Sequence, residues 1–278
     1  MDGSVEFRRR RSAHARWAGR SAYIPLVSFA VGADLYDRFM GRYSVPLAPG
    51  FADLASVDTG QRVLDVGCGP GALTTELVRR LGRDAVSAVD PSEPFVAAAR
   101  ERHPGVDVQH AAAEELPFRD DVFDAALAQL VVHFMADPVA GLREMTRVTR
   151  KGGVVAASVW DHAGGQGPLS LYWRAARELD AGVEGESRLA GAGEGELGQL
   201  FREAGLHEIE ETALSVRVDH PSFEEWWEPY TLGVGPAGAQ LVALDLPQRA
   251  RVQARCRELL GDGPIATTAT AWAARGSR

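Results

Sequence analysis

Three glycines between two acidic residues form the segment of this sequence best suited to binding a ligand. Residues 63–71 read Val-Leu-Asp-Val-Gly-Cys-Gly-Pro-Gly, with Asp65 two residues before the first glycine, and Asp90 follows further on. Glycine permits positive φ angles and lets the backbone approach a ligand closely. Backbone N–H groups at the start of a following helix add hydrogen-bond donors. The segment therefore predicts a small-molecule site at this turn.

Two classes of ligand suit the turn. Gly67-x-Gly69-x-x-Ala72 satisfies the dinucleotide fingerprint with alanine in third place, and Asp90 can hold a ribose diol in either case. Asp65 separates the two classes, because a pyrophosphate would meet it as a like charge whereas the ammonium of an amino-acid ligand would be attracted. Pro70 also departs from the usual dinucleotide loop. The residues favour a ligand with an amino-acid cation over a nicotinamide dinucleotide.

Alternating strands and helices position this turn. Apolar runs predict strands at 62–66, 85–89, 106–109, 122–128 and 154–160, with helices at 72–81, 93–102 and 138–148 between them. Leu73 and Leu77 stand at helical spacing, Gly82 ends their helix, and Ser92 can cap the next one. Such alternation predicts a parallel sheet covered on both faces, with ligands bound at the carboxyl ends of its strands.

The regularity weakens after Trp160. Helices are expected at 169–179, 196–204, around Trp226 and at 241–260, and strands at 208–218 and 265–273. Pro247 either kinks the helix at 241–260 or marks its true start. Two insertions above the sheet edge hold Trp173, Trp226, Trp227 and Tyr230. These aromatic side chains form either a lid for an apolar or planar substrate or the packing that holds the insertions on the sheet.

Downstream residues give the glycine turn a more specific setting. They read EELPF at 114–118, VFD at 122–124, QLVVHF at 129–134 and RVTRKGGVV at 147–155. Together with Asp65, the glycines and Asp90, they resemble class I S-adenosylmethionine (SAM)-dependent methyltransferases. The resemblance is to the small-molecule branch (methyltransferase type 11) that includes ubiquinone and menaquinone methyltransferases. It covers about 33–160, and DLYDRFMGRYS at 34–44 resembles the helix that closes over the cofactor.

The resemblance implies a Rossmann-like α/β fold with a seven-stranded, mostly parallel sheet, helices on both faces and an antiparallel last strand. The methyltransferase domain is expected over 34–278, with insertions at 161–195 and 221–262 forming a substrate lid. Residues 1–33 stand apart, because six arginines fall between Arg8 and Arg20 with no acid among them. We expect a basic, flexible arm here, although a basic start before an apolar run also resembles a secretory signal.

The resemblance also implies roles for individual residues. Asp65 would orient the ammonium of SAM, Asp90 would bind its two ribose hydroxyls, and Gln129 would lie near its sulfonium. Ala112 departs from the family pattern, which has an aspartate there for the adenine amino group, so weaker adenine selectivity is expected. The expected cofactor-binding residues are Tyr36, Arg42, Asp65, Gly67, Cys68, Gly69, Gly71, Asp90, Pro91, Ala113, Glu114 and Gln129.

The chemistry of methyl transfer makes modest demands on side chains. Transfer from a sulfonium is an in-line displacement, so the protein mainly aligns and desolvates the acceptor. A hydroxyl acceptor usually also needs a base. His133 ranks first as this catalytic base because it follows the fourth strand at the ligand edge; the other candidates are His110, His162, Asp161 and Tyr43. The sequence shows no metal-binding constellation, and the acceptor atom stays open among O, N, C and S.

Composition narrows the class of protein. The chain has 278 residues, 45% hydrophobic and 24% charged, which is typical of globular proteins. Its net charge of −8 argues against a nucleic-acid partner, and no apolar run is long enough to predict a membrane span. Two distant cysteines, Cys68 and Cys256, fit a reducing cytosol. We expect a cytoplasmic SAM-dependent methyltransferase acting on a small, apolar or planar metabolite. The alternatives are an NAD-type oxidoreductase and a non-catalytic SAM-binding protein.

Overall fold

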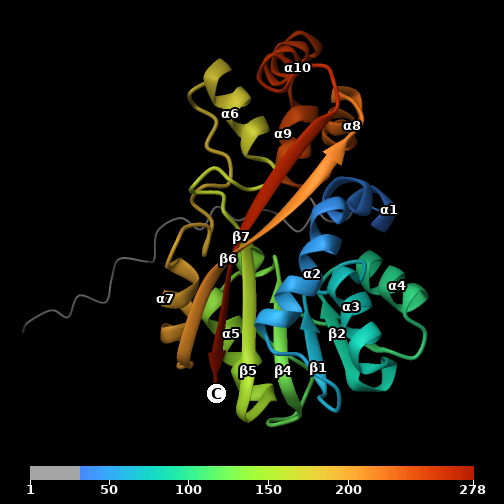
Figure 1. Ribbon diagram of the computed structural model, residues 1–278, viewed down its shortest axis with the longest axis vertical. Helices are drawn as coiled ribbons and strands as arrows, with labels where there is room; N and C mark the ends of the chain where they lie inside the picture. The colour runs from blue at the N-terminus through green and yellow to red at the C-terminus, as the bar shows by residue number, and fades with distance from the viewer. Residues whose placement is uncertain (1–31) are drawn as a thin grey trace, which may run out of the picture.

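Seven strands pair in the order β3-β2-β1-β4-β5-β7-β6 in the computed structural model, which describes residues 32–278 (Figure 1). They are β1 (Val63–Val66), β2 (Val86–Asp90), β3 (Asp107–His110), β4 (Phe123–Gln129), β5 (Thr149–Trp160), β6 (His207–His220) and β7 (Ile265–Ser277). The first five strands are parallel, and β7 is antiparallel to both of its neighbours. The expected Rossmann-like fold, including its antiparallel last strand, is confirmed. The arm predicted at 1–33 lies outside the described residues except at its end.

Helices cover both faces of the sheet because each buries one apolar stripe. On one face lie α2 (Arg42–Leu54), α3 (Ala72–Leu81) and α4 (Glu93–Arg102), whose Phe51, Leu77 and Val96 join one hydrophobic core. On the other face lie α5 (Pro138–Val148) and α7 (Glu196–Glu203), whose Met145 and Phe201 join a second core. Parallel strands covered in this way present their carboxyl ends, and the loops after them, at one edge.

The observed helix bounds show how well local sequence signals predict where helices begin and end. The helices at 72–81 and 93–102 have the bounds predicted for them. Ser92 stands at the N-cap of α4, but the predicted side-chain cap bond is not formed. The helix predicted at 241–260 is two helices, α9 (Gly235–Ala243) and α10 (Leu246–Leu260). Asp245 caps α10 by accepting from the Gln248 N–H, so Pro247 marks a helix start rather than a kink.

A continuous helical stretch precedes the first strand, and its side chains pack on two different parts of the molecule. It comprises α1 (Ala33–Tyr36), the π-helical turn η2 (Asp37–Gly41) and α2. Tyr36 packs on Phe95 of α4, with ring centroids 5.1 Å apart. Phe39 packs on Tyr230 instead, at 5.2 Å. The π-turn thus directs neighbouring side chains toward different parts of the molecule, as such turns often do at functional sites.

The β6–β7 hairpin extends past the end of β5 and carries a separate cluster of helices. β5 ends at Trp160 opposite Ala271, whereas β6 and β7 remain paired up to His220 and Ile265. The chain between them forms α8 (Phe223–Trp227), η5 (Glu228–Leu232), α9 and α10, against which α6 (Ser170–Leu179) packs. We call α6 and residues 221–264 the apical subdomain, which lies beyond the carboxyl ends of the parallel strands (Figure 1).

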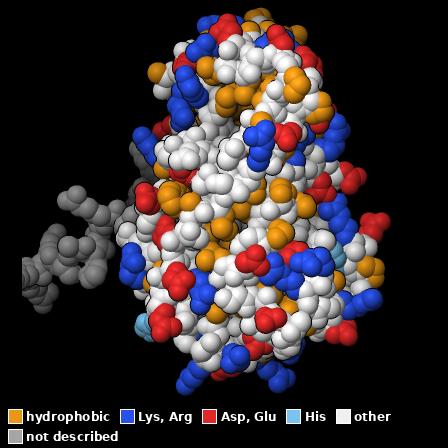
Figure 2. Space-filling model, in the orientation of Figure 1, with side chains coloured by type: hydrophobic (Ala, Val, Ile, Leu, Met, Phe, Trp, Pro, Cys, Tyr) orange, Lys and Arg blue, Asp and Glu red, His pale blue; other side chains and the backbone are white. Residues whose placement is uncertain are grey.

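The apical subdomain has its own aromatic core. Tyr230 lies at its centre, with ring centroids 4.9 Å from those of both Tyr172 and Trp226. On the face shown in Figure 2, hydrophobic side chains gather around the middle of the molecule and beneath the apical helices, while charged side chains dominate the outer rim. None of the helices within residues 32–278 has the length and apolar character required to cross a membrane.

Candidate functional site

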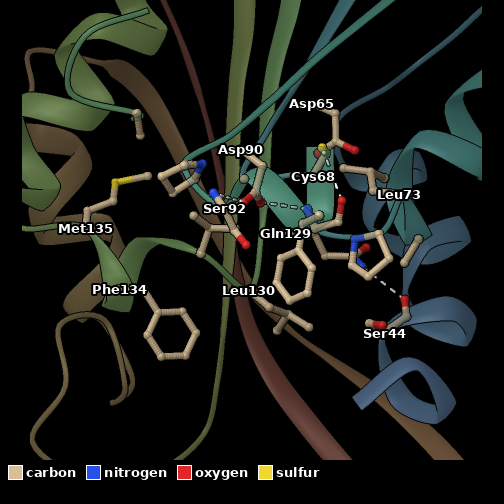
Figure 3. A pocket seen from close by; sticks show the side chains of 18 of the residues that line it. Ser44, Asp65, Cys68, Leu73, Asp90, Ser92, Gln129, Leu130, Phe134 and Met135 are labelled. Carbon is tan, nitrogen blue, oxygen red and sulfur yellow. Dashed lines mark hydrogen bonds between the residues drawn. The ribbon is translucent and has the colours of Figure 1, made fainter. Parts of the chain in front are cut away.

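A cavity of about 340 Å³ opens where the carboxyl ends of the parallel strands meet the first helices (Figure 3). The loops after β1, β2, β3 and β4 line it, together with residues from α1, η2 and α2. The strand order reverses between β1 and β4, because β2 lies on one side of β1 and β4 on the other. Ligands of open α/β sheets bind at such a switch point.

Most of the residues predicted for the site come together around this cavity. Those that line it are Tyr36, Asp65, Gly67, Cys68, Gly69, Asp90, Pro91, Ala113, Glu114, Gln129 and His133. They come from five segments far apart in the sequence. The glycine turn, the acid after the second strand and the end of the fourth strand therefore converge as predicted.

Arg42 and Gly71 lie outside the cavity. The Arg42 guanidinium donates to the Arg38 carbonyl and lies 3.1 Å from Nδ1 of His220, so it faces the apical side of α2. Gly71 is the N-cap of α3 with φ +104°, where a Cβ would lie 2.7 Å from Nε2 of His103. Its positive φ favours glycine for a backbone reason, and neither residue's placement supports the cofactor contact predicted for it.

Asp90 lies at the centre of the cavity, at the end of β2 (Figure 3). Its Oδ2 accepts from the Gly69 N–H at 2.8 Å and its Oδ1 from the Ser92 N–H at 2.8 Å. These bonds tie the carboxylate to the glycine turn and fix its orientation. Burial raises its pKa to about 6, while the two backbone donors act against that rise. The remaining lone pairs of a fixed carboxylate suit a pair of hydroxyl donors.

Asp65 lies deeper, with its side chain almost fully buried in β1. Thr74 Oγ1 of α3 donates to its Oδ2 at 2.6 Å. Burial raises the pKa of Asp65 to about 7, and the nearby charge of Asp90 adds to the rise. A cation in the cavity would favour the ionised form of both carboxylates, since opposite charges stabilise each other strongly in a buried site.

The raised pKa of Asp65 predicts a pH-dependent stability without ligand. Its pKa is about 3.9 in an unfolded chain, so the folded state binds more protons between roughly pH 4 and pH 7. The folded state therefore loses stability as pH rises through this window. Asp65→Asn should gain stability relative to wild type from pH 5 to pH 8, by up to a few kcal/mol. Urea unfolding of both proteins across this range measures the difference.

The decisive quantity in that measurement is the difference in free energy of unfolding between Asp65→Asn and wild type at each pH. Buried His133, His162 and His220 have pKa values lowered chiefly by burial, so they contribute a stability that rises with pH and opposes the trend of Asp65. They are common to both proteins and cancel in the comparison. A variant that loses stability relative to wild type as pH rises would contradict the buried position of the Asp65 carboxylate.

The glycines of the turn serve different purposes. Gly67 has φ +70°, and a Cβ there would lie 2.5 Å from both methyl groups of Val131. Gly69 has φ +53°, and a Cβ there would meet nothing within 4 Å. Gly67 is thus required by the loop after β4, which packs over it, whereas Gly69 leaves open space beside the Asp90 carboxylate. Of these two glycines, only Gly69 matches the prediction that glycine leaves room for a ligand.

Three lining residues carry buried polar atoms that have no hydrogen-bond partner. These atoms are Ser44 Oγ, Gln129 Oε1 and His133 Nδ1. Gln129 Nε2 donates to the Ser44 carbonyl at 3.0 Å, joining the end of β4 to α2 (Figure 3). The His133 ring lies beside that of His162, with centroids 5.6 Å apart. Leaving such atoms unpartnered costs free energy, so this side of the cavity is suited to a hydrogen-bonding ligand.

The sequence prediction missed the apolar wall of the cavity. Leu130, Val131, Phe134 and Met135, from the loop after β4 and its turn η4 (Val132–Phe134), all line it. The signal was present, because this stretch follows a strand at the ligand edge. Asp37 was missed as well; it accepts from Arg102, which also donates to the Pro70 carbonyl of the glycine turn.

Glu114 lines the cavity but its carboxylate already has partners. Its Oε1 accepts from the backbone N–H groups of Ala136 and Asp137, at 2.7 and 3.2 Å. The side chain therefore fastens the loop after β4 to the loop after β3. What Glu114 offers a ligand is chiefly its backbone, beside Ala113 and Pro91.

The aromatic residues of the insertions do not line the cavity. Trp173, Trp226, Trp227 and Tyr230 are buried in the apical core, where they pack on one another. Trp160 is also buried, with its ring centroid 6.3 Å from that of Tyr43. Of the two interpretations left open by the sequence, their positions support packing rather than a wall around a substrate.

Comparisons with known proteins agree with this architecture. Residues 64–157 match the model of a methyltransferase domain family. An uncharacterized methyltransferase of Mycobacterium tuberculosis is 38% identical over 135 residues, which are 49% of this chain and 52% of that protein. A demethylmenaquinone methyltransferase of Paenarthrobacter aurescens is 33% identical over 122 residues, 44% of this chain and 46% of that protein. The chain spans about half the length of the curated relatives it matches.

The solved structures extend the likeness over most of the fold. The crystal structure of a SAM-dependent methyltransferase from Thermotoga maritima, a possible histamine N-methyltransferase, is 20% identical with a TM-score of 0.56. The match covers 91% of this chain and all of that one. At this identity the likeness concerns the fold. The resemblance predicted from the sequence motifs is confirmed over the domain that carries the glycine turn.

Proposed function

We propose, because residues 64–157 carry a methyltransferase domain, that this protein moves a methyl group from SAM to a small molecule. One observation carries the proposal. The Asp90 carboxylate, fixed by the Gly69 and Ser92 N–H groups, faces a cavity that Gly69 leaves open. That arrangement suits a ribose diol at the switch point of the sheet.

The residues of the cavity fit SAM in charge as well as in shape. Asp90 would hold the ribose hydroxyls, and Asp65 would attract the ammonium group at the glycine turn. Pro91, Ala113 and Met135 give apolar surface for the adenine. The structure describes no group of three or more His, Cys, Asp or Glu side chains in residues 32–278 that could hold a metal ion.

The chain's own contribution to the reaction is alignment and exclusion of water. When bound, SAM supplies a methyl group activated by a positively charged sulfur. Leu130, Val131 and Phe134 form an apolar wall that keeps water away from the reacting atoms. Gln129 and His133, beside this wall, offer hydrogen bonds that can orient the acceptor.

Calorimetric titration with SAM, S-adenosylhomocysteine (SAH) and NAD tests the proposal. We expect SAM and SAH to bind and NAD to bind weakly or not at all. Asp65→Asn removes the partner of the ammonium, so SAM affinity should fall about tenfold, as for the loss of one hydrogen bond to a charged group. Under the oxidoreductase alternative the same change removes a repulsive charge, and NAD affinity would stay level or improve. Tight NAD binding without SAM binding would overturn the proposal.

Two further proposals concern the apical subdomain and the cellular compartment. We propose that the insertions expected at 161–195 and 221–262, which contain most of the apical subdomain, cover the acceptor side of the cavity. We also propose that the protein works in the cytoplasm, where the free, buried Cys68 and Cys256 would stay reduced.

Turnover of an acceptor in the presence of SAM separates an enzyme from a non-catalytic SAM-binding protein.

A further inference from the structure

We propose, resting on the methyl transfer proposed above, that the acceptor is an uncharged molecule with a hydroxyl group. Ser44 donates to the oxygen of that hydroxyl on one side of the cavity, and His133 accepts its proton. The inference follows from three kinds of observation: unpartnered polar atoms, the charges around the cavity and the apolar wall beside them.

The unpartnered atoms define what a ligand must supply. Ser44, Gln129 and His133 are 5%, 8% and 7% exposed, and their unpartnered atoms are themselves buried, so these side chains must turn toward the cavity to meet a ligand. The Gln129 amide nitrogen already donates to the Ser44 carbonyl, which leaves Oε1 as an acceptor in need of a donor. Ser44 Oγ can donate or accept, and so can an imidazole nitrogen according to its tautomer. A hydroxyl group has one proton to donate and an oxygen that can accept, so it can pair with His133 and Ser44 together, while Gln129 Oε1 needs a separate donor.

The charges around the cavity exclude an ionic acceptor. Among the described residues, no lysine or arginine lines the cavity, so an anionic acceptor beside the carboxylate of SAM would add a second negative charge with no cationic side chain near it. The four acids that line it already have partners: Asp37 with Arg102, Asp65 with Thr74, Asp90 with Gly69 and Ser92, and Glu114 with Ala136 and Asp137. None of them belongs to the side built by α2, the end of β4 and η4. A cationic acceptor would find no free carboxylate there.

The surroundings of His133 keep its imidazole in the neutral form. Burial, and next to it the neighbouring His162, lower the pKa of His133 well below its usual range, so the imidazole is neutral near pH 7. A neutral imidazole has one nitrogen free to accept a proton. Leu130 and Phe134 beside it provide apolar contact for the carbon skeleton of the acceptor.

The proton step balances without a further reactant. The hydroxyl oxygen forms a bond to the methyl carbon of the sulfonium donor while the carbon–sulfur bond breaks and its electron pair stays on sulfur. The hydroxyl proton passes to the imidazole nitrogen of His133 and then to solvent. The products are a methyl ether and a neutral thioether.

Four probes with one ring system test the substrate class. They are 2-naphthol, naphthalene, 2-naphthoate and 2-naphthylmethylammonium, titrated by fluorescence into protein saturated with SAH. We expect 2-naphthol to bind at least tenfold more tightly than each of the other three. Preference for the anion or the cation, equal binding of naphthalene, or failure of 2-naphthol to bind would each overturn the inference.

Two variants test the residues. Ser44→Ala removes an unpartnered buried hydroxyl, so thermal stability should stay level or rise while 2-naphthol affinity falls several-fold. His133→Phe keeps a ring of similar size, and should keep SAH affinity within twofold while formation of 2-methoxynaphthalene from 2-naphthol and SAM falls at least a hundredfold. His207→Phe, an exposed histidine at the opposite end of the sheet, is the matched control and should change neither.

The outcomes separate this inference from the proposed function. Absence of SAH binding by the wild-type protein contradicts the proposed function itself. SAH binding without a preference for 2-naphthol contradicts only the acceptor class. Stability that falls in Ser44→Ala, with 2-naphthol affinity unchanged, shows that the hydroxyl has a structural role and overturns its part in binding.

Discussion

Asp90→Ala should lower the affinity for SAM by about 1.5–3 kcal/mol, the range for hydrogen bonds to a charged group. That loss corresponds to roughly a 10- to 150-fold higher dissociation constant. The structure adds a reason beyond the ribose contact, because the carboxylate also holds the Gly69 and Ser92 N–H groups. Alanine leaves both N–H donors without their partner. The glycine turn is then held less firmly, and the ligand loses the acceptor for its ribose hydroxyls. Calorimetric titration of SAM into both proteins measures the change.

The control for this prediction is Asp84→Ala. Asp84 is an exposed aspartate in η3 (Arg83–Ala85), just before β2, whereas Asp90 ends the same strand. It carries the same charge change and should leave SAM affinity within twofold. Equal affinities for wild type and a folded Asp90→Ala protein would remove Asp90 from the proposed site.

Gly67→Val is expected to destabilise the fold rather than only block the cavity. At φ +70° a β-branched residue is strained by about 1–3 kcal/mol. Its Cβ would also lie 2.5 Å from the Val131 methyl groups, and such overpacking typically costs about 1–3 kcal/mol. The total, roughly 2–6 kcal/mol, is a large share of the stability of an ordinary domain. Chemical unfolding of the two proteins measures it.

A double-mutant cycle separates strain from collision. Gly67→Ala and Val131→Ala are each made alone and then combined. The combined variant relieves the collision but not the backbone strain, so its loss of stability should be smaller than the sum of the two single losses. Strict additivity would contradict the close contact between the two positions.

The glycine turn also shows how far sequence reasoning reached. The sequence predicted that these glycines let the backbone approach a ligand, but at Gly67 the direction of a Cβ is occupied by Val131 and not by open space. Val131 lies more than 60 residues further along the chain, and no periodicity within either segment records their contact. Gly69, by contrast, does open on the cavity.

Local signals predicted the elements well because each has a local physical cause. The bounds of α3 and α4 follow from helical spacing and from flanking glycine and proline residues. The break between α9 and α10 was left open, since Pro247 permits both a kink and a start until Asp245 is seen to cap the helix. Arg42 was predicted to bind the cofactor, but its guanidinium lies against the Arg38 carbonyl and His220, and no local signal records a contact with a residue so far along the chain.

The placement of Trp226, Trp227 and Tyr230 could not be predicted, for a different reason. Aromatic residues near a ligand edge can line a cavity or build a core, and only the length of the β6–β7 hairpin decides between them. Because the hairpin continues past Trp160, these residues have helices of their own to pack with. The sequence predicted the strands but not how far their pairing continues.

The long hairpin has a consequence for how such a protein can diversify. Every residue that lines the cavity lies between Tyr36 and Ala136, whereas the apical subdomain begins at Ser170. The cavity is therefore encoded ahead of the apical subdomain. Recombination at one crossover between them would exchange the apical subdomain together with α7, β6 and β7, which also lie in the later stretch. The pairing of β5 with β7 joins the two stretches, as do side-chain contacts such as Arg38–Glu228 and Arg42–His220. A functional exchange has to retain or replace these contacts, and they are the natural places to look for co-inherited changes.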